Sequence, residues 1–317
     1  MATDGSVSSP APLAPDEAFA LLGNEMRMEI LQVLGEADGP MTFTELRDRV
    51  GIRQGGQFNY HLDKLVGHFV AKTDDGYSIG RPGRRIIEAV LSGAVTDDPV
   101  IDRTGIDFAC LLCNAPIEVC FQQERLELYC TECAGQYGDS LGQRESITTD
   151  RRGYLGQFPL PAAGIDGRTP EEVLDAASLW AHLELLAAAN GVCPRCSAVV
   201  DRSVHVCEDH DASEGLCPTC DQRHEVTIEN RCTNCVYEIQ GIAVIQLISN
   251  PDLRSFVAER GIDPLAQGVK WGWEYDENVH SAEPFEATFT FAIDGDGITL
   301  RVDDEFEVVD VTRSQAV

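Results

Sequence analysis

The chain of 317 residues is long for one domain and suits two to four small ones. It carries 53 Asp and Glu against 24 Lys and Arg, which gives a formal net charge of −29 at pH 7. A charge of this size argues against binding a polyanion, because the summed field repels phosphates.

The scarcity of lysine suggests another cause for the acidity. The chain contains only three lysines, Lys64, Lys72 and Lys270. Proteins of organisms that keep molar salt in the cytoplasm share this composition, since self-repulsion is screened over roughly 3 Å at 1 M ionic strength. We therefore attribute the acidity to habitat and not to the choice of partner.

The sequence predicts a cytoplasmic protein without a membrane partner. No apolar run approaches the roughly 18 to 20 residues that a membrane span requires. The start, "MATDGSVSSPAPLAP", lacks the basic and apolar regions of a signal peptide, so residues 1–15 are predicted to be a disordered leader. Twelve cysteines in that compartment favour metal or redox roles over disulfides.

Residues 16–95 are predicted to form a compact helical unit with a hairpin. Asn24 is placed to cap one helix, and Thr42 and Glu45 are in capping-box register at the start of the next. After a third helix, two short strands meet at a turn that contains Gly76, and "RPGRRIIEAVLSG" resumes helix. This order of elements is typical of a winged helix-turn-helix DNA-binding domain.

The third helix has one apolar face and one basic, polar face. Phe58, Leu62 and Leu65 repeat at spacings that face inward. The stretch from Arg53 to Arg85 holds six basic and three acidic residues, so positive charge is retained where phosphates would lie. The residues expected to contact DNA are Arg53, Gln54, Gln57, Tyr60, Lys64, Arg81, Arg84 and Arg85. A winged helix used only for protein contacts is the alternative.

In "GQFNYHLDKLVGHFV" and "DDGY" the sequence resembles the ArsR-like winged-helix transcriptional regulators of halophilic archaea, over about residues 14 to 95. The resemblance implies DNA binding through Gln54 to Val66, with the hairpin around Asp74 to Gly76 as the wing. Metal-sensing members of that family carry cysteines on the recognition helix. Residues 1–109 contain none, so metal-responsive derepression through that helix is not implied.

Two cysteine pairs predict a zinc ribbon at residues 105–137. "CLLC" and "CTEC" are separated by a segment that alternates like a hairpin, which would bring Cys110, Cys113, Cys130 and Cys133 around one zinc ion. A thioredoxin-like site would need a single C-x-x-C in a βαβ setting. Cys120 is left over and is expected to have no ligand role.

Residues 192–238 are predicted to hold two further zinc sites. Seven cysteines and His210 form four pairs, each with two residues between its members. We call each such pair of ligands a knuckle. His205 and His224 are expected to be surface or cross-strand residues. The eight predicted ligands are Cys193, Cys196, Cys207, His210, Cys217, Cys220, Cys232 and Cys235.

Two pairings of these four knuckles are open. Sequential pairing joins the first knuckle with the second and the third with the fourth, with "AVVDRSVHV" and "DQRHEVTIENR" as two separate hairpins. Cross-bracing, as in RING fingers, joins the first with the third and the second with the fourth. We favour sequential pairing because it closes shorter loops. Under either pairing every ligand is a protein group, so three structural zinc ions are expected and a zinc hydrolase is not.

The remaining segments are a connector with a helix, residues 138–191, and an α/β C-terminal region, residues 239–312. The connector helix is signalled by a Thr169 cap and Pro170 at its first position. The end of the chain alternates apolar residues across an Asp-Gly turn and predicts a β-meander. Trp180, Trp271 and Trp273 are expected in the core, with a ligand pocket lined by them as the alternative.

The predicted fold class is therefore α+β: a winged helix-turn-helix, three zinc-ribbon-like modules and a small antiparallel β/α region. No nucleophile–base pair, phosphate loop or dinucleotide fingerprint is present, so no enzyme is predicted. The expected function is transcription regulation through double-stranded DNA, with a homodimer and the transcription machinery as further partners. The alternative is a general transcription factor resembling the archaeal TFIIE α subunit, which acts through contacts with RNA polymerase.

Overall fold

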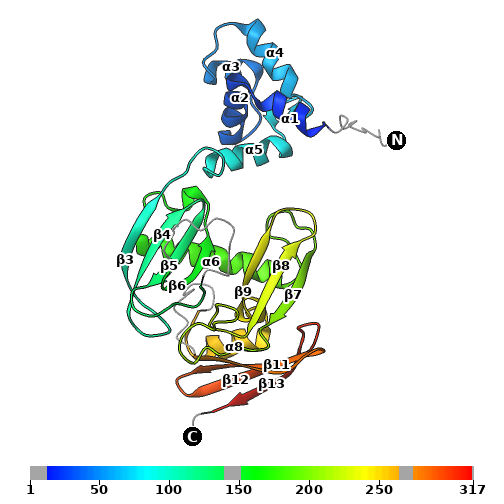
Figure 1. Ribbon diagram of the computed structural model, residues 1–317. Coiled ribbons are helices and arrows are strands. Elements are labelled where there is room, and N and C mark those ends of the chain that lie inside the picture. The colour runs from blue at the N-terminus through cyan, green and yellow to red at the C-terminus, as the bar shows by residue number, and fades with distance from the viewer. Residues whose placement is uncertain (1–12, 139–150, 264–273, 316–317) are drawn as a thin grey trace, which may run out of the picture. The chain divides into compact units, whose positions relative to one another are not determined.

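The computed structural model describes residues 13–138, 151–263 and 274–315. The chain divides into two compact units, Met1–Asp97 and Asp98–Val317. Its architecture is α+β, as predicted, with four antiparallel sheets among the described residues (Figure 1). Most of the predicted leader, and the predictions for Trp271 and Trp273, lie outside the described residues. The finer division of residues 105–312 into four segments stays a prediction.

The first unit consists of five helices and a two-stranded hairpin in its described part. Their bounds are α1 Pro15–Leu22, α2 Glu25–Glu36, α3 Phe43–Arg49, α4 Gly55–Leu65, β1 Val70–Thr73, β2 Gly76–Ile79 and α5 Arg81–Leu91. The predicted caps are confirmed: the Asn24 side chain accepts from the N–H of Arg27, and Thr42 and Glu45 form a capping box. Gly76 has a φ of 129° at the hairpin turn, where a side chain would collide with the Met41 carbonyl.

The core of the first unit lies between α2, α4 and the hairpin. Ile30 and Leu31 of α2 pack in one buried cluster with Phe58, Leu62 and Leu65 of α4. The apolar stripe predicted for α4 is thus buried. Its opposite face is left to solvent.

The second unit begins with a four-stranded sheet in the order β3-β4-β5-β6. Its strands are β3 Ile101–Ala109, β4 Pro116–Gln122, β5 Arg125–Cys130 and β6 Tyr154–Pro159. Gln123 and Glu124, both at positive φ, join β4 to β5 in a two-residue turn. A second sheet has the order β7-β8-β9, with strands Val200–Val206, Val226–Cys232 and Glu238–Ile242.

Helix α6, Pro170–Ala189, connects these two sheets along the chain and packs on both (Figure 1). Val173, Leu174 and Ala177 belong to the core of the first sheet, and α6 also contacts η1 (Ala162–Gly164). Ala188 belongs to a small cluster under the second sheet. Although α6 is long and apolar, no helix in the described part of the chain meets the length and hydropathy that a membrane span requires.

The prediction that Trp180 lies in the core is wrong, since its side chain is 40% exposed. Helix α6 is apolar on every side along most of its length, so the residue pattern did not reveal which face is buried. The cap prediction for this helix is confirmed, with Thr169 and Glu172 in a capping box and Pro170 at the first position.

The chain ends in a four-stranded meander that packs on two short helices. These elements are α7 Val244–Leu247, α8 Pro251–Glu259, β10 Glu274–Ala282, β11 Phe285–Ile293, β12 Asp296–Val302 and β13 Val308–Ser314. The strand order β10-β11-β12-β13 is that of the predicted β-meander. Phe289 and Phe291 of β11 are fully buried in a cluster that also contains Phe256 of α8 and Ile228 of β8.

This cluster predicts a large effect for its central ring. Phe289→Ala should lower the free energy of unfolding of the second unit by about 3–5 kcal/mol, because it leaves a cavity in a fully buried site. Guanidinium chloride unfolding at fixed KCl concentration measures this change. Val309→Ala, which trims a 47% exposed side chain on β13, is the control and should shift stability by less than about 0.5 kcal/mol. Equal effects of the two substitutions would contradict the placement of this core.

Candidate metal centres and nucleic-acid interface

The twelve predicted ligands gather into three clusters, each with four ligand atoms within 4.8 Å of one another. The first cluster lies at one end of the first sheet of the second unit and consists of Cys110, Cys113, Cys130 and Cys133. The other two lie at opposite ends of the β7–β8 hairpin. We call the one at the open end the outer cluster (Cys193, Cys196, Cys232 and Cys235) and the one at the tip the inner cluster (Cys207, His210, Cys217 and Cys220).

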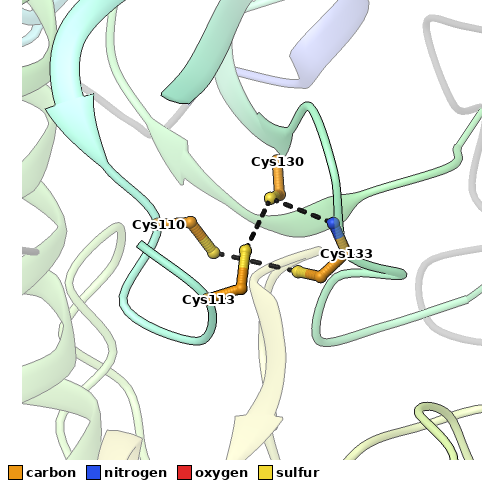
Figure 2. Close-up of side chains that lie close together, drawn as sticks. All are labelled: Cys110, Cys113, Cys130 and Cys133. Atoms are coloured by element: carbon orange, nitrogen blue, oxygen red, sulfur yellow. Dashed lines mark hydrogen bonds between the residues drawn. The ribbon is translucent and has the colours of Figure 1, made fainter. Parts of the chain in front are cut away.

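In the first cluster four sulfurs converge from two chain segments. Figure 2 shows Cys110 and Cys113 on one loop facing Cys130 and Cys133 on the other. The Sγ atoms of Cys110 and Cys133 are 3.9 Å apart, and those of Cys113 and Cys130 are 3.4 Å apart. The β4–β5 hairpin positions the pairs, since Ile117 pairs directly with Cys130.

These separations fit a tetrahedral metal ion. A Zn–S bond of about 2.3 Å implies sulfurs about 3.8 Å apart at the corners of a tetrahedron. In the outer cluster the corresponding distances are 3.6 Å between Cys193 and Cys235 and 3.5 Å between Cys196 and Cys232. The three clusters can therefore each hold a metal ion, and their donor sets are consistent with structural zinc.

The same backbone turn shapes one C-x-x-C knuckle in each cluster. The residue after the second cysteine has a φ of about 60° in all three, a conformation that Asn and Asp tolerate best. These residues are Asn114 (62°), Ser197 (63°) and Asp221 (58°). In each knuckle this residue donates its N–H to the carbonyl of the first cysteine, at 2.7, 2.8 and 2.7 Å respectively.

The first and outer clusters also share the turn at their second knuckle. Thr131 donates its N–H and hydroxyl to the carbonyl of Pro116, and Thr233 does the same to Val199. The two acceptors lie six residues after Cys110 and Cys193. The first and outer centres are thus built by one repeated arrangement of knuckle, strand, strand and knuckle.

Both pairings considered for residues 193–235 are wrong. The first knuckle joins the fourth and the second joins the third, so the inner cluster is nested inside the outer one. "AVVDRSVHV" and "DQRHEVTIENR" are likewise not two hairpins, because they supply the two strands of a single one, β7 and β8.

The β7–β8 ladder is the physical reason for the nesting. Val200 pairs with Cys232 at one end, and Val206 pairs with Val226 at the other. Once the strands pair, the outer knuckles are already side by side, so the loop-closure argument for an open chain no longer applies. A signal in the sequence would have revealed this: "CLLCNA" and "CTEC" of the first centre correspond to "CPRCSA" and "CTNC", the outer knuckles.

The inner centre has three sulfurs and one imidazole. Nδ1 of His210 lies 3.5 Å from Cys220 Sγ, close to the about 3.6 Å expected for a zinc-bound nitrogen and sulfur. Nε2 of His210 lies 3.2 Å from the carbonyl oxygen of Arg223. A donated Nε2–H would fix the tautomer in which Nδ1 is free to bind metal.

Hydrogen bonds lower the pKa of one cysteine thiol in each centre. The N–H of Ala198 lowers the pKa of Cys196 to about 6, and the N–H of Asp211 lowers that of Cys217 to about 6. Burial opposes this for Cys130, yet the N–H groups of Glu132 and Cys133 bring its pKa to about 7. These hydrogen bonds favour the thiolate form of one cysteine in each centre, which is the form that binds metal, whereas the pKa values of Cys133, Cys220 and Cys235 are raised to about 12.

The inner centre also anchors its surroundings. Arg223 donates its N–H to the carbonyl of Gln136 and its Nε–H to that of Gly135, and Gly138 donates to Asp221. The segment after Cys133 of the first centre is thus hydrogen-bonded to the residues that follow Cys220 of the inner centre. On the other side, the carboxylate of Glu277 on β10 accepts from the N–H groups that follow this knuckle, those of Glu225 and Val226.

Three residues near the centres are not among the ligands. Cys120 is buried on β4, where burial and the nearby Glu127 raise its pKa to about 12. His205 is an exposed residue of β7 whose Nε2 lies 3.7 Å from Glu229. The prediction that His224 is a surface or cross-strand residue is wrong: it precedes β8, packs edge-on against Tyr275, and burial lowers its pKa to about 4.

The residues expected to contact DNA are all exposed on the first unit. Arg53 precedes α4 and Gln54 occupies its N-cap position without a side-chain capping bond, while Gln57, Tyr60 and Lys64 lie on the helix itself. Lys64 Nζ lies 5.7 Å from the centre of the Tyr60 ring, within cation–π range. The other three, Arg81, Arg84 and Arg85, lie in the first turns of α5, where Arg85 is 3.4 Å from Glu88.

A family model described as Domain of unknown function (DUF7351) matches residues 107–308, nearly two thirds of the chain. The chain belongs to the DUF7351 family. The DUF7351 match takes in all three candidate metal centres. A second model, Domain of unknown function (DUF7347), matches residues 15–90 and takes in the basic residues of α4 and α5. Searches of curated proteins and of solved structures found no match.

Nested pairing predicts how cysteine substitutions combine. Cys196→Ser and Cys232→Ser remove ligands of the same centre, so the double variant should lose one metal ion, whereas sequential pairing would cost it two. Native mass spectrometry of the metal-loaded protein counts the ions. Cys120→Ser is the matched control and should keep all three. Loss of two ions from the double variant, with both other ligand sets intact, would contradict the nested arrangement.

The same arrangement predicts a spectroscopic difference between the outer and inner centres. His210→Ala should remove the ion with three sulfur ligands and leave the two four-sulfur centres, because no other described cluster includes His210. Cobalt substitution distinguishes the two kinds of centre by their visible absorption. A His210→Ala protein that binds three cobalt ions with unchanged spectra would remove His210 from the ligand set.

Proposed function

We propose that this chain is a transcription regulator whose first unit binds duplex DNA as a winged helix-turn-helix and whose second unit is held together by three structural zinc ions. The observation that carries the DNA-binding part is the exposed face of α4. Opposite its buried stripe, this face presents side chains suited to phosphates and base edges, among them Gln57, Tyr60 and Lys64.

Local charge supports this assignment. A chain of net charge −29 opposes DNA at long range, yet α4, the hairpin and the start of α5 carry an excess of basic side chains. Lys72 of β1 is one of them, with Nζ 5.3 Å from the centre of the Tyr77 ring. In molar salt the long-range repulsion is screened within a few ångströms, while direct contacts to phosphates persist.

A structural role for zinc is supported by the ligand sets. Each centre has four protein ligands, which fill the tetrahedral positions and leave none open for water. The ions would therefore stabilise the fold of the second unit and activate no nucleophile.

A protein-contact function like that of the archaeal TFIIE α subunit is the second candidate. It is favoured by one observation, the apolar tip of the knuckle formed by Cys110 and Cys113, where Leu111 is 53% exposed. In this reading the knuckle, rather than α4, would form the essential contact with the transcription machinery. Retention of RNA polymerase by the immobilised chain, and its loss with Leu111→Glu, would favour this candidate.

The DNA-binding proposal predicts different effects for charged and polar residues of α4. Lys64→Ala should lower the salt dependence of binding by about one unit, because one phosphate contact is lost. Gln57→Ala should weaken discrimination between sequences by about 1–3 kcal/mol if the amide contacts adenine. Fluorescence anisotropy with a promoter duplex, titrated from low to multimolar KCl, measures both.

Arg254→Ala is the matched control, since it changes the net charge equally on an exposed site of the second unit, in α8. It should leave both the salt slope and the sequence preference unchanged. Equal DNA binding by the wild type and a folded Arg53→Ala, Gln57→Ala, Lys64→Ala variant would refute recognition through α4.

A further inference from the structure

Helix α6 has a second face that the described part of the second unit leaves largely exposed. Its buried side chains lie within one half of the helix circumference, at about 100° per residue. On the other half, Leu179 is 43% and Leu183 50% exposed, and Trp180 flanks them. Contiguous apolar side chains of this size rarely face solvent on a monomer, so they indicate a contact surface.

The exposed face has a regular spacing. Its central residues follow one another at intervals of three, four and three: Ala176, Leu179, Leu183 and Leu186. This is the a/d spacing of a helix that packs along its length against another helix. We call these four residues the α6 seam. None of the four is charged, in a chain whose net charge is −29; the same spacing reaches Glu172 at the start of the helix, where its carboxylate accepts from the N–H of Thr169.

The seam is complementary to itself. If two copies of α6 pack antiparallel about a twofold axis at position 181, Leu179 of each copy meets Leu183 of the other. About the same axis, Ala176 meets Leu186, so a small side chain opposes a large one in the next layer. A twofold interface requires this reciprocity, and a face that binds an unrelated partner does not.

We propose that the α6 seam is the interface of a homodimer in which two α6 helices pack antiparallel. The self-complementary spacing favours a second copy as the occupant, and the charge of the chain restricts this contact to high salt. Two chains of −29 repel each other, and an uncharged strip, with the long-range repulsion screened by salt, allows them to approach. At 20 residues, α6 is about 30 Å long, enough for both leucine layers and the small–large layers outside them.

The buried face of the same helix contacts the outer metal centre. Glu184 is buried on α6 and its carboxylate lies 3.0 Å from Arg195, a residue of the first knuckle of that centre. The helix that carries the seam is therefore held in place by this knuckle. This inference concerns the second unit and does not depend on DNA binding.

Sedimentation velocity of the full chain in multimolar KCl tests the proposal. The wild type should be dimeric at micromolar concentration, and Leu183→Glu should raise the dimer dissociation constant by about a hundredfold or more, because it places an unpaired carboxylate in an apolar contact. Val236→Glu is the control: Val236 is 95% exposed and lies outside the seam, so the dimer should persist. Three bound metal ions in each variant would establish that it is folded.

A second experiment tests the antiparallel register. Leu179→Glu and Leu183→Lys should each be monomeric alone, and an equimolar mixture should form heterodimers, because these two positions meet across the axis. A parallel pair would bring each position against itself, and the mixture would stay monomeric. That result, with a dimeric wild type, would overturn the register. A monomeric wild type, or a Leu183→Glu dimer as tight as the wild type, would overturn the interface and leave the face to another part of the chain or to a different partner.

Discussion

The pairing of β7 with β8 is the interaction on which the second unit depends. The ladder fixes the outer knuckles at one end and the inner knuckles at the other, so a single hairpin positions eight of the twelve ligands. Val226 and Ile228 of β8 pack in the meander core, whereas the cluster near the outer centre is small, and two of its five buried members, Cys193 and Cys232, are themselves candidate ligands. At that end of the hairpin the buried core and the ligand set share residues, so metal binding there would be coupled to folding.

Contacts between neighbouring elements then join the sheets into one unit. Helix α6 contributes to the cores of the first and second sheets, and the knuckle at Arg223 binds the backbone that follows the first metal centre. Glu277 ties the meander to the start of β8 through two backbone N–H groups. The inner centre lies where these connections meet, so its ion would stabilise the mutual placement of the sheets as well as its own loop.

Local signals in the sequence were sufficient for much of the fold. Caps at Asn24, Thr42 and Thr169 could be predicted because each involves side chains and N–H groups within one helical turn. The twelve ligands could be found because knuckle spacing is also local. The pairing of knuckles has no such local signal, since it depends on a strand ladder that brings together cysteines up to 42 positions apart; only the repeat of "CLLCNA" and "CTEC" as "CPRCSA" and "CTNC" indicates it. The exposed side of α6 was missed for a related reason: an apolar helix has no periodicity that reports which neighbours it has.

The turn between β4 and β5 gives the nested arrangement a further meaning. There, two residues at positive φ, Gln123 and Glu124, close the hairpin directly. At the same place in the second hairpin stands the whole inner centre, from Cys207 to Cys220. Hairpin tips accept insertions more readily than any other part of a sheet. The second hairpin therefore has the arrangement of the first, with a metal-binding loop in the place of the two-residue turn. Changes of sequence in this loop can leave the strand pairing that forms the outer centre intact.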